Sequence, residues 1–170
     1  MRKTRILLAW MFFFAFSNLA QATTVERLNL DALVKKSNRI VVGRVRNSRT
    51  YWSSNGKLIL TSYIIDVQET LKGQTASTVE LTTIGGQIGD LTLHVAGMPV
   101  FAKDENAVVF LENTGTYSTV VGLAQGKFAV ANGEVSNDVI GLDFPDGSSA
   151  RPTKMPLATF RRLIKLSLDR

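Results

Sequence analysis

Alternating apolar and polar residues run through the middle of the chain. A first run sets Val41, Gly43 and Val45 against Val42, Arg44 and Arg46. This two-residue period is that of a strand with one interior face and one cationic face. An Asn-Gly dipeptide then favours a hairpin, and the long return strand needs a bulge or bend. Interior residues predicted on the return strand are Leu58, Leu60, Tyr63, Ile65, Val67 and Leu71.

Further strands and two helices complete the expected secondary structure. Strands are predicted at 77–84, 107–112, 118–123 and, as a hairpin, 125–135. Leu30, Leu33 and Val34 share one face of a short helix. A last amphipathic helix follows Met155-Pro156. The intervening stretch 143–156 holds three of the four prolines and is predicted to be a loop.

These elements predict a mainly β fold. The expected architecture is an OB-like, netrin-like barrel of about five or more antiparallel strands, with a short N-terminal helix and a C-terminal amphipathic helix. We assign residues 23–144 to a single barrel domain, and residues 145–170 to a loop and a C-terminal helix packed on it. The sequence shows no internal repeat and no second domain.

The first 22 residues have the layout of a secretory signal peptide. Three cations precede an apolar run at 6–16, and small residues follow at Ala20 and Ala22. The apolar run is shorter than the ~20 residues that span a bilayer. Residues 1–22 are therefore predicted to be cleaved after Ala22, which leaves an exported chain, periplasmic or secreted, without a membrane span.

Removal of this segment changes the charge of the chain. The net charge of +6 falls to +3, because 17 Lys and Arg then face 14 Asp and Glu. This excess is too weak to indicate a nucleic-acid partner, which usually needs a concentrated basic face. The chain has no cysteine, so thiol nucleophiles, thiolate zinc sites and stabilising disulfides are all excluded.

Two glycine clusters resemble nucleotide-binding loops. In 120–130, only three residues separate Gly122 from Gly126, and Phe128 replaces the hydroxyl residue of a P-loop. In the second cluster, the spacing of Gly85, Gly86 and Gly89 departs from the dinucleotide fingerprint. Strand-like alternation follows both clusters, whereas a phosphate-binding loop opens a helix. We expect no nucleotide and no cofactor.

Catalytic residue types are sparse. His94 is the single histidine, so a multi-histidine metal site is excluded and no metal is expected. A hydrolase that pairs His94 with a carboxylate such as Asp90 remains an alternative. Another interpretation places His94 on a half-buried strand, without a catalytic role. The glycine connection of Gly85, Gly86, Gly89 and His94 is a second candidate binding segment, although a structural role is favoured.

The principal candidate site is a cationic and aromatic face. It consists of Arg44, Arg46, Arg49, Tyr51 and Trp52. Arginine next to exposed aromatic residues is typical of interfaces, and the alternative is a solvated strand face. We expect a non-catalytic exported module that binds a protein or envelope partner.

Longer segments carry a resemblance to known proteins. The order of LDALVKKSNRIVVGRV, YIIDVQETLKG, GGQIG, GMPVFAKDENAVVFL and VGLAQGKFAV resembles a family of uncharacterised exported bacterial proteins over about 30–130. The first half is also similar to the netrin-like module of tissue inhibitors of metalloproteinases. That resemblance implies an OB-type five-stranded barrel. It also adds a protease-inhibitor-like role as an alternative, although the N-terminal cysteine that those inhibitors place on the protease zinc is missing here.

Overall fold

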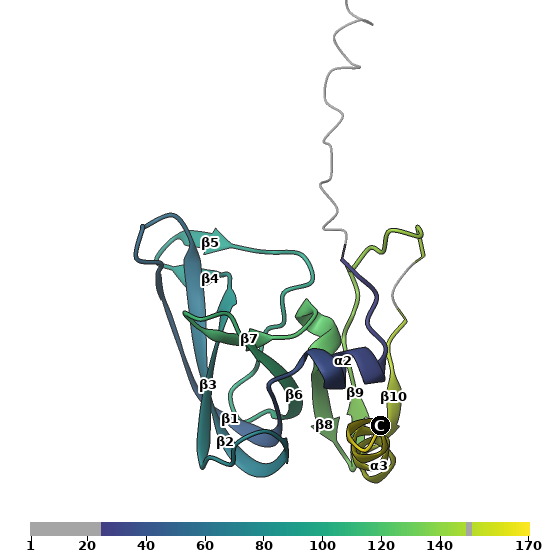
Figure 1. Cartoon of the computed structure of the whole chain (residues 1–170). Helices are drawn as coiled ribbons and strands as arrows, with labels where there is room; N and C mark the ends of the chain where they lie inside the picture. The colour runs from purple at the N-terminus through teal and green to yellow at the C-terminus, as the bar shows by residue number, and fades with distance from the viewer. Residues whose placement is uncertain (1–24, 149–150) are drawn as a thin grey trace, which may run out of the picture.

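The computed structural model describes residues 25–148 and 151–170 (Figure 1). The predicted signal peptide, residues 1–22, and its cleavage site lie outside the described residues. Within the described ranges, no helix has both the length and the apolar character needed to cross a bilayer.

Strands dominate the described chain, which confirms the mainly β prediction. One antiparallel sheet has the order β10-β9-β8-β6-β1-β2-β3, and β7 also pairs with β6. Its strands are β1 (Arg39–Trp52), β2 (Ile59–Lys72), β3 (Thr78–Ile84), β6 (Asn106–Asn113), β7 (Ser118–Val120), β8 (Lys127–Ala131), β9 (Glu134–Ser136) and β10 (Lys154–Pro156). A separate hairpin joins β4 (Gly86–Ile88) to β5 (Leu91–Leu93). The helices are α2 (Leu30–Lys36), α3 (Leu157–Leu168) and the 3-10 helix η1 (Leu123–Gly126).

The sheet does not close into a barrel within the described residues. The strand path ends at β3 on one side and at β10 on the other. One edge of β6 is divided between β8, paired at residues 107–109, and β7, paired at residues 111–113. β3 and β7 come close together, but they are not hydrogen-bonded neighbours. The architecture is therefore an open sheet whose β1–β2–β3 part curls over an apolar interior (Figure 1).

The return strand β2 has the predicted irregularity, because Gln68 and Leu71 are extra residues in its pairing with β1, and β1 has one extra residue as well, Arg46. The register of β1 against β2 shifts at three places, the last between Val45 and Asn47. Up to Val67, β2 alternates regularly and points Tyr63 and Ile65 into the interior, as predicted. The prediction for Leu58 is wrong, since its side chain is 40% exposed in the hairpin turn. Leu60 is buried as predicted, although its position opposite Tyr51 places it on the other face of the sheet from Tyr63.

Two apolar clusters lie on opposite faces of the central strands. On β1, Val41 and Val45 belong to the cluster inside the curled sheet, as the alternation predicts. Val42 shares the opposite face with Arg44, yet it is buried because α2 and α3 cover that part of the sheet. The helix-covered cluster contains Leu33, Val34, Ile40, Val42, Val108, Phe110, Val121, Phe128, Val135, Phe160 and Ile164. A β-sheet with apolar residues on both faces thus forms the middle layer of this half of the molecule.

Both predicted helices are present. The Asn29 side chain caps α2 by accepting a hydrogen bond from the Ala32 backbone N–H at 2.8 Å. In α3, Phe160 and Ile164 are buried, whereas Leu168, predicted on the same side, is 38% exposed near the end of the chain. The two helices lie side by side on one face of the sheet, where α2 contacts β6 and α3 contacts β2, β9 and β10 (Figure 1).

The stretch predicted as a loop ends in a strand. β10 pairs with β9, with Met155 opposite Val135. The backbone and side chain of Asn137 extend this pairing through hydrogen bonds with the Thr153 backbone. The proline argues against a strand when the sequence alone is read, but Pro156 is tolerated because β10 is the edge of the sheet.

Candidate functional site

Acidic neighbours neutralise the first two arginines of the predicted cationic face. Arg44 Nη2 lies 2.7 Å from Asp104 Oδ1, and the two side chains are each 54% exposed. Arg46 forms an ion pair with Asp66, to which its Nε also donates a hydrogen bond at 2.9 Å. These two arginines therefore present little uncompensated charge to a partner.

Because of the bulge in β1, Arg49 and Tyr51 share the face of Arg44, whereas Trp52 lies on the opposite face. Arg49 and Tyr51 pair with Ser62 and Leu60 on the outer face, and the Arg49 guanidinium lies 5.2 Å from the Tyr51 ring centroid. Trp52 pairs with Ile59 and so belongs to the opposite face, with 42% of its surface exposed. Among the described residues, no carboxylate forms an ion pair with Arg49.

The glycine connection forms the β4–β5 hairpin. Gly86 has φ +132°, and a Cβ atom there would lie 2.5 Å from Thr61 Oγ1 and 2.7 Å from Thr50 Cγ2. Thr61 Oγ1 also donates a hydrogen bond to the Gly85 carbonyl at 2.7 Å. Gly85 and Gly86 thus let the backbone pack directly on the sheet. Gly89, with φ +56°, lies in the turn between the two strands.

His94 follows β5 and lines two adjoining hollows of about 260 and 410 Å³. Asp90, its predicted partner, lines neither of them. At ~3.3 Å per strand residue, the Cα atoms of Asp90 and His94 are roughly 13 Å apart. The larger hollow instead brings Ser136 and Asp138 near His94, but Asp138 Oδ1 accepts a hydrogen bond from the Ile140 backbone N–H.

In the loop that resembles part of a P-loop, the glycines have a structural role. Gly122 has φ +65° and precedes η1, while a Cβ atom at Gly126 would lie 2.3 Å from the Val121 carbonyl oxygen. Lys127 is engaged elsewhere, because its Nζ lies 2.7 Å from Glu105 Oε1 and donates to the Val100 carbonyl at 2.6 Å.

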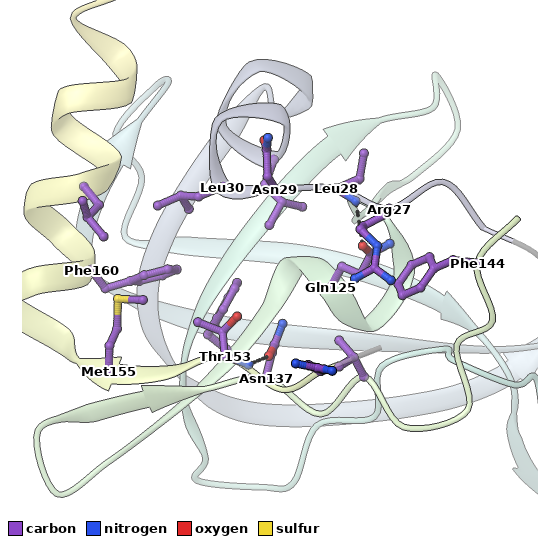
Figure 2. Close-up of a pocket in the computed structure, with 15 residues that line it drawn as sticks. Arg27, Leu28, Asn29, Leu30, Gln125, Asn137, Phe144, Thr153, Met155 and Phe160 are labelled. Atoms are coloured by element: carbon purple, nitrogen blue, oxygen red, sulfur yellow. Dashed lines mark hydrogen bonds between the residues drawn. The ribbon is translucent and has the colours of Figure 1, made fainter. Parts of the chain in front are cut away.

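A larger pocket lies at the other end of the sheet, where sequence analysis predicted no site. It has a volume of about 490 Å³ and lies between the N-terminal segment, α2, α3 and the ends of β8–β10 (Figure 2). The Phe128 and Phe160 rings, 4.5 Å apart, form part of its buried wall. The apolar lining consists of Leu28, Leu30, Leu33, Phe128, Val139, Phe144, Met155, Phe160 and Leu163.

Gln125 fixes the N-terminal wall of this pocket. Its side chain is buried, accepts a hydrogen bond from Leu28 N–H at 2.8 Å and donates to the Glu26 carbonyl at 3.0 Å and the Gly122 carbonyl at 3.1 Å. A buried amide with its groups satisfied positions a segment well, because releasing the segment would leave polar atoms without partners. The N-terminal segment is thus part of the folded body.

Two arginines line the pocket together with the apolar wall. The Arg27 guanidinium stacks at 4.1 Å from the Phe144 ring centroid and donates a hydrogen bond to Ser148 Oγ. Arg151 reaches the same pocket from the segment before β10, and both arginine side chains are exposed. No Asp or Glu is among the described residues that line the pocket. The mouth is therefore positively charged and the interior is apolar.

One carboxylate lies outside the lining but near Arg27. The pKa of Asp146 is below its ordinary value, first because the Ser148 side chain and backbone N–H donate hydrogen bonds to it, and also because Arg27 lies nearby. Asp146 is fully exposed, so water screens its attraction for Arg27.

Sequence analysis missed this pocket because its residues are spread from 27 to 163. These residues come together through the pairing of β10 with β9 and through the Gln125 contacts, and no local sequence pattern predicts either of these. The described residues contain no group of three or more His, Asp or Glu side chains that could hold a metal ion. No protein-family model matches the chain, and no match is found among curated proteins or solved structures.

Proposed function

We propose that this protein is a non-catalytic exported binding protein and that the pocket between the N-terminal segment and α3 holds its ligand. One observation carries the proposal: an apolar pocket of about 490 Å³ with a few polar groups at its edge. Ligand sites are commonly concave, largely apolar and ~300–1,000 Å³ in volume. Buried Phe128 and Phe160 make the wall rigid, so the site is formed before a ligand arrives.

A neutral fluorescent probe tests whether the pocket binds apolar molecules. N-Phenyl-1-naphthylamine should become fluorescent with the full chain and lose this signal in Leu30→Trp and Met155→Trp. Both residues are half-buried in the lining, so the larger ring fills the pocket without replacing a core residue.

Val100→Trp is the matched control, because Val100 is 69% exposed and lines the two hollows that contain His94. Loss of the signal in Val100→Trp, with normal binding in the two pocket variants, would place the site in those hollows and contradict the proposal.

A second candidate function is contact with a protein or envelope partner through the hairpin end of β1 and β2. Arg49 and Tyr51 carry it, because Arg49 has no ion-pair partner among the described residues, in contrast to Arg44 and Arg46. Trp52 and Leu58, both partly exposed, lie at the same hairpin end. Arg49→Gln should then weaken capture of that partner while Arg44→Gln has little effect.

Three further interpretations stay predictions. The hydrolase alternative now rests on His94 with Ser136 and Asp138, which line one hollow. The OB-type relationship and the inhibitor-like role rest on the resemblance in the first half of the chain. The curled β1–β2–β3 meander supports an OB-type ancestry, whereas the absent cysteine gives an inhibitor no zinc ligand of the known kind.

A further inference from the structure

The charge and the hydrogen bonds of the pocket point to a particular class of ligand. On the basis of the function proposed above, we propose that the pocket binds a single-chain amphiphile: an alkyl chain that ends in an oxyanion, such as a carboxylate or a phosphate. The chain lies against the aromatic wall, and the anionic end lies at the mouth with Arg27 and Arg151.

The mouth selects for negative charge. Arg27 and Arg151 are the charged residues of the lining, and both carry guanidinium groups that pair well with carboxylate and phosphate oxygens. Two asparagines add donors, since the Oδ1 atoms of Asn29 and Asn137 already accept hydrogen bonds from Ala32 N–H and Thr153 N–H. Their amide NH₂ groups are thus the ends that remain to face a ligand oxygen.

The interior selects for a chain without polar groups. A peptide would bring amides that need hydrogen-bond partners once they are buried. The buried polar side chain there, Gln125, already uses its oxygen and its amide nitrogen on the protein backbone. Leu33, Phe128 and Phe160 offer only apolar contact. An alkyl chain needs no hydrogen bonds and therefore fits this interior better than a peptide does.

A matched set of ligands tests the charge preference. Dodecanoate, dodecyl phosphate, dodecanol and dodecyltrimethylammonium should be titrated against the bound naphthylamine probe below their micelle concentrations. We expect the two anions to displace the probe most strongly, the alcohol more weakly and the cation weakest. Dodecanoate and dodecyl phosphate distinguish a fatty-acid type of head group from a phospholipid type.

Chain length and arginine variants locate the two ends of the ligand. Each additional buried CH₂ should tighten binding roughly fourfold until the pocket is full. Arg27→Gln with Arg151→Gln should weaken the binding of dodecanoate by roughly fivefold or more and leave the affinity for dodecanol unchanged. The expected loss is modest because each exposed ion pair contributes little. Arg162→Gln, on the exposed side of α3, is the matched control and should change the affinity for neither ligand.

The outcomes separate this inference from the proposed function. Equal affinity for dodecanoate and dodecanol, or a double arginine variant that binds dodecanoate normally, would overturn the anionic-ligand inference while the pocket stays a binding site. Stronger displacement by a short apolar peptide than by dodecanoate would also overturn it. Failure of the neutral probe to bind at all would contradict the proposed function itself.

Discussion

Lys127 illustrates how neighbouring side chains decide the role of a single residue. Its ammonium group forms an ion pair with Glu105, and each of these side chains is only 17% exposed. It also lies 4.8 Å from the Phe101 ring centroid. The sequence places this lysine after two glycines, as in a nucleotide site, but the structure directs it to the segment that precedes β6. The prediction that no nucleotide binds here remains, with a physical reason for it.

Loss of the Lys127 charge should destabilise the fold. Lys127→Met leaves the largely buried Glu105 carboxylate without its cation, so the free energy of unfolding should fall by about 2 kcal/mol or more. Urea unfolding measures this change. Lys103→Met removes an exposed lysine nearby and should have an effect of about 0.5 kcal/mol or less. Adding Glu105→Gln to Lys127→Met should recover part of the loss, and the absence of any coupling would argue against the pair.

At the scale of elements, the alternation of apolar and polar residues predicts which segments are strands, but it does not predict where the pairing register shifts. The pattern predicts β1 with Val41 and Val45 inside, because residue type and strand period agree there. The extra residue at the Val45–Asn47 shift leaves no sign in the pattern, and it places Trp52 on the face opposite Arg44, which without the shift would be the same face. The sequence does not predict β10 for a related reason, because three residues that contain a proline form a strand only when β9 supplies the partner.

The ion pairs of β1 change what a charge-reversal experiment will report. With Arg44→Glu and Arg46→Glu together, new carboxylates would lie beside Asp104 and Asp66, so like charges repel and the melting temperature should fall. Arg44→Gln with Arg46→Gln removes the charges without this repulsion and should change stability by about 1 kcal/mol or less. Thermal unfolding at two salt concentrations checks the comparison, and an equally stable double Glu variant would contradict it.

At the scale of the whole molecule, the segments nearest the two ends of the described chain build the pocket together. The N-terminal segment is bonded to Gln125 and, through Val25 N–H at 3.1 Å, to the Asp143 carbonyl. From the other end, β10 and α3 supply Met155, Phe160 and Leu163. The sequence predicts α2 and α3, but it does not predict that they help to enclose a site, because that depends on contacts between distant segments.

Processing of the chain is the prediction that belongs to this scale. Cleavage after Ala22 should leave a mature chain that begins at Thr23, because the charged start, the apolar run and the small residues fit a signal peptidase site. Intact-mass measurement of the exported protein tests this prediction. Retention of Met1 in the exported form would show it to be wrong, while retention only after Ala20→Leu with Ala22→Leu would support it.

Because of the Gln125 contacts, hydrogen exchange can detect when the N-terminal wall of the pocket opens. These contacts join residues 97 and 99 positions apart, so they close a very long loop and form late relative to the local hairpins. The Leu28 backbone amide depends on a side-chain acceptor and not on a sheet ladder. Its exchange with deuterium should therefore follow the detachment of this wall while the amides of β1 stay protected, and a ligand seated in the pocket would slow that one exchange first.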